Sequence, residues 1–325
     1  MKRNSPTFKI KTLFFAITFA TAALSGCGGS SSPVATLPPE APPVVSPVKW
    51  EVRESVSSVV KGNYLSVVKN LDSYDIYSNF DGSDNTRQAK LYKYSGRSLD
   101  TMQIPVVDLD IQGKYLRTIG LQKDTDGTIF AILRMSDGPY GSGSYYPYFA
   151  KKNTNGKWSY VDKKLWLGNS NSNTLIVNSS SFSPPSPRLQ DQKFVVYDDS
   201  FGVKIALTAS KDGLSWNTLS TNNSPKELLP PEKSKDNPQF LSAVKTPNAT
   251  HLIYANWSDS AAAATNLVHL YSENGEDFCV LDSNSATMNG AKGTTLYYDA
   301  DNKEVHAVTN GKHLAFKDQK FSCQK

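Results

Sequence analysis

Short runs of β-branched, aromatic and aliphatic residues fill the chain from Lys49 to its end at residue 325, and they predict an all-β fold. Clusters of Asn, Asp, Gly and Ser separate these runs about every 8–12 residues, which is the spacing of strands and turns in an all-β domain. No segment has a sustained apolar period of 3.6 residues, so the pattern does not favour a helical domain.

The runs also repeat, which makes the prediction more specific. Each unit ends in a turn glycine, and these are Gly96, Gly156, Gly213, Gly275 and Gly311. Several short strands in a unit of about 60 residues are typical of one blade of a β-propeller. We predict five blades; a sixth blade in a divergent stretch and a single β-sandwich are the alternatives. The shorter last unit predicts a blade that is completed by residues 48–52, which would remove an exposed sheet edge.

The first 26 residues have the order of a secretory signal peptide. Four basic residues precede an apolar run from Leu13 to Leu24. The run is shorter than the roughly 20 apolar residues that span a bilayer. Without these basic residues the formal charge falls from +5 to +1, so charge gives no support for nucleic-acid binding.

The sequence Leu24-Ser25-Gly26-Cys27 resembles the lipobox of bacterial lipoproteins. The resemblance implies that the preceding peptide is removed and that Cys27 is lipidated. Several acyl chains on this cysteine would together give stable membrane anchoring. In this family an Asp after the cysteine favours retention in the inner membrane; here that residue is Gly28, so for a Gram-negative source we expect the outer membrane. An ordinary secreted protein is the alternative interpretation.

Residues 28–48 are rich in Gly, Ser and Pro, a composition that favours extended polyproline II over a packed core. We therefore divide the chain into a signal peptide (1–26), a lipidated cysteine with a disordered tether (27–48) and a propeller domain (49–325).

Cys279 and Cys323 remain as an even pair once Cys27 is assigned to the lipid. In an oxidising compartment such a pair predicts a disulfide, with two buried free thiols as the alternative. The four histidines show no metal-ligand spacing with these cysteines, so we expect neither a metal nor a cofactor. We expect most of the histidines to be packed within strands; they are His251, His269, His306 and His313.

Two turns resemble the Asp-box of sialidase-like propellers. The better copy contains Ser210, Asp212, Gly213 and Trp216, and the weaker copy contains Ser272, Asn274, Gly275 and Phe278. In such a turn the Asp or Asn side chain bonds backbone amides, and Gly supplies the positive φ. The resemblance supports the fold and implies a structural role for these residues.

Sialidase activity is not expected, although the fold resembles that family. The family clamps a substrate carboxylate with three arginines from separate blades, and here the last 137 residues contain no arginine. Gln103-Ile104-Pro105 has Gln where the family has Arg, and neither Gln nor Lys replaces a bidentate guanidinium.

A glycosidase that uses two carboxylates is the enzymatic alternative. Asp108 and Asp110 are its weak candidates, because they share one face of a predicted strand. The competing interpretation is a solvated strand face.

Residues 137–148 form a Gly/Ser/Tyr-rich segment between two predicted strands. Its candidate ligand-binding residues are Tyr140, Tyr145, Tyr146 and Tyr148, since tyrosine can stack on sugars and anchor protein partners. Alternatively, these rings pack on their own blade.

Together these features predict a lipid-anchored protein of the bacterial envelope, facing either the periplasm or the cell surface. We expect a non-catalytic propeller that binds a glycan or an envelope protein, or that scaffolds an assembly. A glycoside hydrolase-like propeller with an atypical carboxylate site is the alternative. The sequence leaves the ligand and the oligomeric state open.

Overall fold

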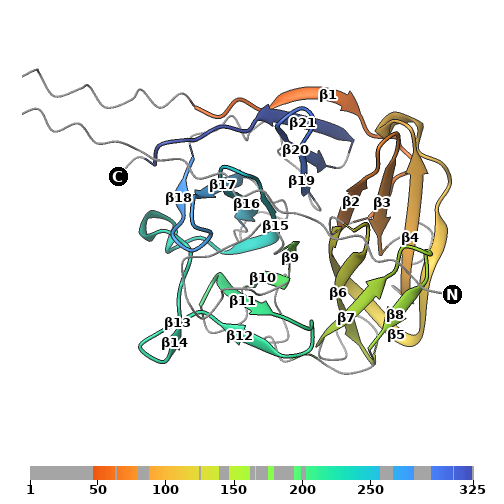
Figure 1. The fold of residues 1–325 in the computed structure, drawn as a ribbon, viewed down its shortest axis with the longest axis horizontal. Helices are drawn as coiled ribbons and strands as arrows, with labels where there is room; N and C mark the ends of the chain where they lie inside the picture. The colour runs from red at the N-terminus through yellow and green to blue at the C-terminus, as the bar shows by residue number, and fades with distance from the viewer. Residues whose placement is uncertain are drawn as a thin grey trace, which may run out of the picture. The chain divides into compact units, whose positions relative to one another are not determined.

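Five groups of four antiparallel strands stand in a ring, and this arrangement is a five-bladed β-propeller (Figure 1). The predicted fold class and blade number are therefore confirmed. The structure is a computed structural model, and it describes residues 47–62, 64–79, 88–123, 126–138, 146–161, 165, 175–178, 194–198, 203–256, 266–281, 294–309 and 311–323. Cys27 and the predicted tether up to residue 46 lie outside the described residues, whereas Val48 at the end of that range is buried in the core.

Each blade has an inner strand followed by three strands toward the outside (Figure 1). Blade 1 contains β2 (Leu65–Lys69), β3 (Tyr74–Ser78), β4 (Gln88–Gly96) and the first part of β5 (Val106–Lys123). Blade 2 contains the rest of β5, then β6 (Ile129–Ser136), β7 (Tyr146–Lys152) and β8 (Trp158–Tyr160). Blade 3 contains β9 (Leu175–Asn178), β10 (Phe194–Asp198), β11 (Ala206–Ser210) and β12 (Trp216–Thr218).

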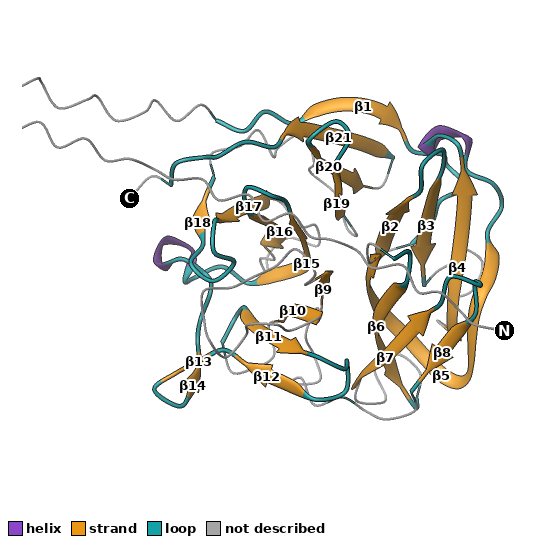
Figure 2. Ribbon diagram, viewed as in Figure 1, coloured by secondary structure: helices purple, strands orange, loops and turns teal. Residues whose placement is uncertain are grey.

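Blade 4 contains β15 (Pro238–Lys245), β16 (Thr250–Asn256), β17 (Asn266–Ser272) and β18 (Cys279–Val280). Blade 5 contains β19 (Thr295–Asp299), β20 (Glu304–Thr309), β21 (Lys312–Lys317) and β1 (Glu51–Ser55). A small hairpin, β13 (Ser220–Thr221) and β14 (Ser224–Pro225), and two short 3-10 helices, Leu99–Thr101 and Pro231–Lys233, complete the described elements (Figure 2).

Strand β5 belongs to two blades. Its first part pairs with β4, and its second part, from Tyr115 onward, pairs with β6. Two register shifts in the pairing with β4 and one in the pairing with β6 accompany the passage of this long strand from the outer edge of blade 1 to the inner edge of blade 2.

The inner strands close the ring. Strand β2 contacts β5, β5 contacts β9, β9 contacts β15, β15 contacts β19, and β19 contacts β2. Because this cycle has five members, it leaves no place for the sixth blade that the sequence allowed.

The core lies between blades rather than inside one. Five separate clusters of buried residues fill the five interfaces between neighbouring blades. This follows from the strand period of two: Ile129, Ala131 and Leu133 face blade 1, while Ile132 packs toward blade 3. Most strands are therefore buried on both faces and read as nearly continuous apolar runs.

An N-terminal strand completes the last blade, as the short final unit predicts, but it spans Glu51–Ser55 rather than the predicted residues 48–52. Strand β1 pairs antiparallel with β21, with Val52 opposite Leu314 and Glu54 opposite His313. The final unit is short because Gly311 follows the second strand of its blade, whereas Gly96 ends the third strand of its blade and Gly156, Gly213 and Gly275 follow the third strands of theirs.

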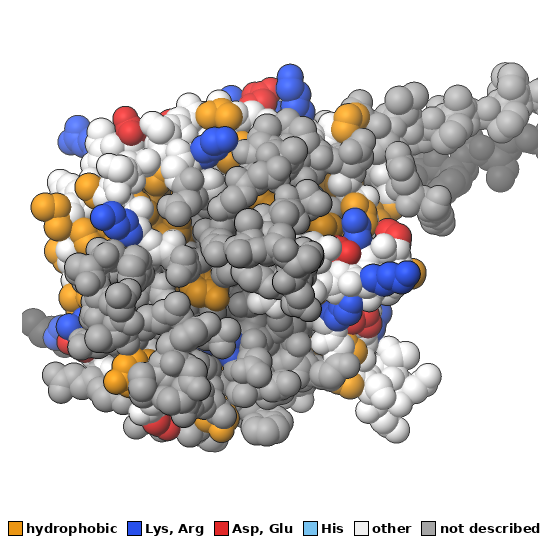
Figure 3. Space-filling view, turned by 180° about the vertical axis from the view of Figure 1, so that it is seen from behind, with side chains coloured by type: hydrophobic (Ala, Val, Ile, Leu, Met, Phe, Trp, Pro, Cys, Tyr) orange, Lys and Arg blue, Asp and Glu red, His pale blue; other side chains and the backbone are white. Residues whose placement is uncertain are grey.

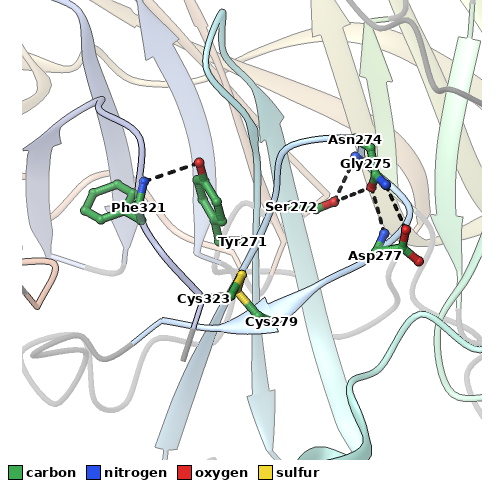
Figure 4. Close-up of a disulfide and its surroundings, with 8 residues drawn as sticks. All are labelled: Tyr271, Ser272, Asn274, Gly275, Asp277, Cys279, Phe321 and Cys323. Atoms are coloured by element: carbon green, nitrogen blue, oxygen red, sulfur yellow. Dashed lines mark hydrogen bonds between the residues drawn. A yellow bond between two sulfur atoms is a disulfide. The ribbon is translucent and has the colours of Figure 1, made fainter. Parts of the chain in front are cut away.

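A disulfide joins Cys279 on β18 to Cys323 at the end of the C-terminal segment (Figure 4). It ties the C-terminal segment of blade 5 to the outer strand of blade 4, and the two Cα atoms lie 5.7 Å apart. Nearby, the backbone N–H of Phe321 donates to the Tyr271 hydroxyl at 3.3 Å. The C-terminal segment is thus held to blade 4 by a covalent bond as well as by packing.

Within the part of the chain that the structure describes, no helix is long and apolar enough to cross a membrane. The same residues contain no group of three or more His, Cys, Asp or Glu side chains that could hold a metal ion. On the face shown in Figure 3, the described Lys/Arg and Asp/Glu side chains are interspersed, as expected from the small net charge.

Candidate functional site

A polar pocket of about 500 Å³ lies between strand β1 and the C-terminal segment that follows β21. The charged side chains that line it come from both ends of the chain: Lys49, Glu51, Arg53, Glu304 and Lys317. They meet only because β1 completes blade 5, which places the start of the domain beside its end. The edges of Phe316 and Phe321 supply an apolar part of the wall.

Glu304 is the buried anion of this pocket. Its Oε1 accepts a hydrogen bond from Arg53 Nη2 at 2.7 Å and lies 3.0 Å from Lys317 Nζ. Burial acts to raise the pKa of Glu304, but Lys317 and Arg53 outweigh burial, and the pKa is lowered. Glu304 is therefore ionised at neutral pH and cannot donate a proton as a general acid.

Arg53 organises the mouth of the pocket. Its Nη1 lies 3.4 Å from Glu51 Oε2, so one guanidinium contacts two carboxylates. Glu51 is half exposed and Lys49 is exposed. A ligand with hydroxyl or anionic groups could therefore exchange contacts with Glu51 and Lys49 while Glu304 stays in place.

Two imidazoles lie behind Glu304. His306 Nε2 is 3.3 Å from Glu304 Oε2, and His306 Nδ1 is 2.7 Å from His313 Nε2. On the far side, His313 Nδ1 is 3.3 Å from Glu54 Oε1. Burial lowers the pKa of His306 to about 4, so the ring is neutral at pH 7. A continuous chain of titratable groups thus runs from Glu304 in the pocket to Glu54 on β1.

Asp108 and Asp110 lie on the first part of β5, the outer strand of blade 1, and away from this pocket. Asp108 Oδ2 accepts hydrogen bonds from Lys152 Nζ at 2.5 Å and from Trp158 Nε1 at 2.9 Å. Both donors belong to blade 2, so Asp108 ties two blades together. Asp110 is exposed.

The tyrosine candidates separate into packed rings and rings outside the described residues. Tyr148 is 1 % exposed, and its ring lies 5.8 Å from that of Tyr160, so it serves the core between blades 1 and 2. Tyr146 is half-buried against the same core. Tyr140 and Tyr145 lie outside the described residues.

The better Asp-box-like turn joins β11 to β12. The Ser210 hydroxyl accepts from the Gly213 amide at 2.8 Å, and Asp212 Oδ1 accepts from the next two amides, each at 2.8 Å. These backbone donors lower the pKa of Asp212. Trp216 Nε1 donates to the Gly213 carbonyl at 3.0 Å, which closes the turn.

The second turn repeats this geometry between β17 and β18 (Figure 4). Ser272 Oγ accepts from the Gly275 amide, and Asn274 Oδ1 accepts from the next two amides, all at 2.8 Å. Phe278 packs edge-on against Tyr197 of blade 3, with ring centroids 5.7 Å apart. Both turns thus use polar side chains to hold backbone, and neither contributes to the pocket.

Sequence reasoning did not identify the pocket. Arg53 and Glu304 carry no motif, and the histidines were expected only to be packed. One signal was present: His269-Leu270 and His313-Leu314 occupy the third strands of consecutive blades, and each strand is preceded by one that contains a further histidine.

No protein-family model matches the chain, and no curated protein matches its sequence. Solved structures do match. A putative glycosidase from Bacteroides thetaiotaomicron covers 83% of this chain and 89% of its own, with a TM-score of 0.55 and 9% identity. An exo-β-1,3-galactanase from Clostridium thermocellum covers 84% of this chain and 63% of its own, with a TM-score of 0.54 and 11% identity.

A third structure is described as part of the GH130 family of mannoside phosphorylases, which contains glycoside hydrolases that target β-1,2-mannosidic linkages. It covers 85% of this chain and 88% of its own, with a TM-score of 0.52 and 13% identity. At these identities the similarity establishes the shared propeller fold. It assigns no residue of this chain to a reaction.

Proposed function

We propose that this protein is a carbohydrate-active β-propeller that binds a glycan and cleaves it. The observation that carries the proposal is the match of the ring, over more than four fifths of the chain, to propellers described as carbohydrate-cleaving enzymes. A propeller can host many functions, so the match supports a class of substrate rather than a particular reaction.

The hydrolase interpretation is better supported than the non-catalytic one, because the matched structures are described as enzymes. A glycoside hydrolase needs a carboxylic acid with a raised pKa as its general acid, and no such group is identified among the described carboxyl groups. Within the described ranges, each carboxyl group with a shifted pKa is shifted down: Asp126, Asp212, Asp277, Asp299 and Glu304. The polar pocket therefore fits glycan binding better than acid catalysis.

The sequence motif at Cys27 supports a location for this activity. In our proposal the lipid holds the domain at the bacterial envelope, on a tether of about 20 residues that reaches up to roughly 60 Å if extended. The domain would then act on glycans within that distance of the membrane.

The function is tested on the chain from residue 27 onward with Cys27→Ser. Polysaccharides and oligosaccharides are incubated with it, with and without inorganic phosphate, and released sugars are measured by chromatography. Binding to the same panel is measured by calorimetry. Released sugars would support the proposed hydrolase. Binding without release would support a non-catalytic glycan-binding role instead. If no glycan in the panel is bound or cleaved, the proposed carbohydrate activity is wrong.

The pocket is tested separately with Lys49→Ala/Gln319→Ala, because both side chains line it and are exposed. We expect weaker glycan affinity and an unchanged melting temperature. Lys320→Ala is the matched control, since Lys320 is exposed and outside the pocket lining. Full affinity in the double variant would place the glycan site elsewhere on the ring.

A further inference from the structure

The N-terminal segment brings three charged side chains to the polar pocket, and the core fixes where they stand. Lys49, Glu51 and Arg53 are alternate residues, and all three line the pocket. The residues that alternate with the first two of them, Val48 and Trp50, are 3 % and 2 % exposed. Because side chains alternate along an extended chain, burial of Val48 and Trp50 directs the charged residues to the pocket side.

The pocket lining carries one more positive charge than negative charge. Its cations are Lys49, Arg53 and Lys317, and its anions are Glu51 and Glu304. Two carboxylates cannot neutralise three cations. A ligand with one negative charge would therefore complement the pocket, whereas a neutral ligand would leave the excess charge in place.

Glu304 holds the guanidinium in position and is not available to a ligand. Its side chain is 9 % exposed, and its Oε1 contacts both Arg53 Nη2 at 2.7 Å and Lys317 Nζ at 3.0 Å. Its other oxygen, Oε2, lies 3.3 Å from His306 Nε2. Both oxygens of Glu304 thus have close neighbours within the protein, and its charge is compensated there.

Glu51 is held more loosely, at the open edge of the same guanidinium. Its side chain is 53 % exposed, and its Oε2 lies 3.4 Å from Arg53 Nη1. This distance exceeds the length of a charge-assisted hydrogen bond, which is about 2.7–2.9 Å. A guanidinium binds planar carboxylates, so a ligand carboxylate can take the position that Glu51 occupies on Arg53.

Two further polar side chains stand at the mouth of the pocket. Lys49 and Gln319 are exposed, and within the ranges that the structure describes no side-chain hydrogen bond or ion pair holds either of them. Lys49 supplies an ammonium group to an anion, and the Gln319 amide can bond a neighbouring hydroxyl. The volume of about 500 Å³ lies within the range of small-molecule sites, about 300–1,000 Å³, so a sugar that carries the anion fits.

We propose that the pocket selects glycans that carry a carboxylate, which means glycans that contain uronic acid residues. The ligand carboxylate replaces Glu51 on Arg53 and contacts Lys49, while Glu304 keeps Arg53 in place. A carboxylate brings the single negative charge that the pocket lacks, whereas a phosphate dianion would bring two. The assignment rests on the proposed carbohydrate function and adds the class of glycan to it.

The test compares matched oligosaccharides by titration calorimetry, on the chain from residue 27 with Cys27→Ser. Trimers of galacturonate, glucuronate and mannuronate are each paired with their carboxyl-reduced form, which keeps the linkages and loses the charge. We expect at least one uronate trimer to bind about tenfold more tightly than its reduced form at low ionic strength. The difference should shrink at about 0.5 M salt, because salt screens exposed charges.

Two single substitutions should act in opposite directions on the uronate trimer. Lys49→Ala should weaken its binding about fivefold, because the ligand loses a cation. Glu51→Gln should strengthen its binding, because it removes the anion that competes for Arg53. Both variants should leave the affinity for the reduced form within about twofold. Lys320→Ala is the matched control, since Lys320 is exposed and outside the pocket lining.

The outcomes separate this inference from the proposed function. If neutral and charged trimers bind equally, or if Lys49→Ala and Glu51→Gln leave the preference unchanged, selection of carboxylates by this pocket is wrong while carbohydrate binding stands. Tighter binding of a sulfated form of the same trimer would also overturn it, because the pocket would then select a sulfate ester. If no glycan of either charge is bound or cleaved, the proposed function fails and this inference fails with it.

Discussion

Arg53 and Glu304 are 251 residues apart in the chain, and their side chains meet at 2.7 Å where the ring closes. The bond joins the N-terminal strand to the last blade. It also places a buried carboxylate between a surface pocket and a pair of imidazoles. Closure of the ring, the pocket and the chain of titratable groups behind it thus depend on the same contact.

Arg53→Ala should destabilise the closure. Glu304 would stay buried with Lys317 as its remaining close cation, and we expect a loss of about 1–2 kcal/mol in the free energy of unfolding. Urea denaturation measures this loss. Arg97→Ala is the control, because Arg97 is exposed, and it should change stability by less than about 0.5 kcal/mol. Equal effects of the two substitutions would contradict the role of Arg53.

Removal of the disulfide should weaken the attachment of the C-terminal segment. The chain-entropy model gives about 3–4 kcal/mol for a bond that closes a loop of this size, and here the sequence separation is 44. Cys279→Ser/Cys323→Ser should therefore melt at a lower temperature than the oxidised chain. Wild type with a reducing agent should match the variant. If reduction leaves the melting temperature unchanged, the bond does not form in solution.

Asp108→Asn should act on stability rather than on glycan chemistry. The substitution leaves Lys152, which is 7 % exposed, without its carboxylate partner, and we expect a loss of about 2 kcal/mol. Asp110→Asn removes an exposed carboxylate and should be close to neutral. If either variant keeps its stability but loses turnover of a glycan substrate, the catalytic interpretation of these residues is the correct one.

Alanine substitutions at two glycines with similar φ angles distinguish the cost of backbone strain from the cost of crowding by a neighbouring side chain. Gly213 has φ of 79° and Gly156 has φ of 76°, so alanine at either position adopts a left-handed conformation. A Cβ at Gly213 would come within 2.6 Å of the Phe149 ring, whereas nothing lies within 4 Å at Gly156. Gly156→Ala should cost about 1–2 kcal/mol, and Gly213→Ala should cost about 1–3 kcal/mol more. Equal costs would show that the ring of Phe149 moves aside freely.

Stability should fall as the pH drops below about 6.5. An unfolded histidine titrates near pH 6.5, and His306 titrates near pH 4 in the folded protein. Between these values the unfolded chain binds more protons, so the full stability is present above about pH 6.5 and is lost toward pH 4. We expect a loss of about 3 kcal/mol from this ring, measured by urea denaturation across the window.

The same measurement in His306→Gln/His313→Gln should give a flatter pH profile. A further loss below about pH 4 belongs to carboxylates such as Asp299, whose pKa is lowered to about 2. Burial opposes this lowering, but the contacts with Lys69 and Asn302 outweigh it. An unchanged profile between pH 6.5 and 4 in the double variant would assign that loss to other groups.

The sequence by itself determined the features that depend on near neighbours in the chain. Alternation along strands, turn chemistry such as that of Asp212 and Gly213, and the repeat of about 60 residues all predicted an all-β propeller. The short last unit predicted that an N-terminal strand completes it. These signals are readable because strand period and turn geometry act over a few residues.

Only the tertiary structure decided which distant groups meet. It brings Arg53 to Glu304, places Asp108 between two blades and buries Tyr148 in the core. It also shows that the histidines form two matched pairs. It also closed the inner ring at five blades. Such contacts depend on the register of each strand within the closed ring, and no local pattern encodes that register.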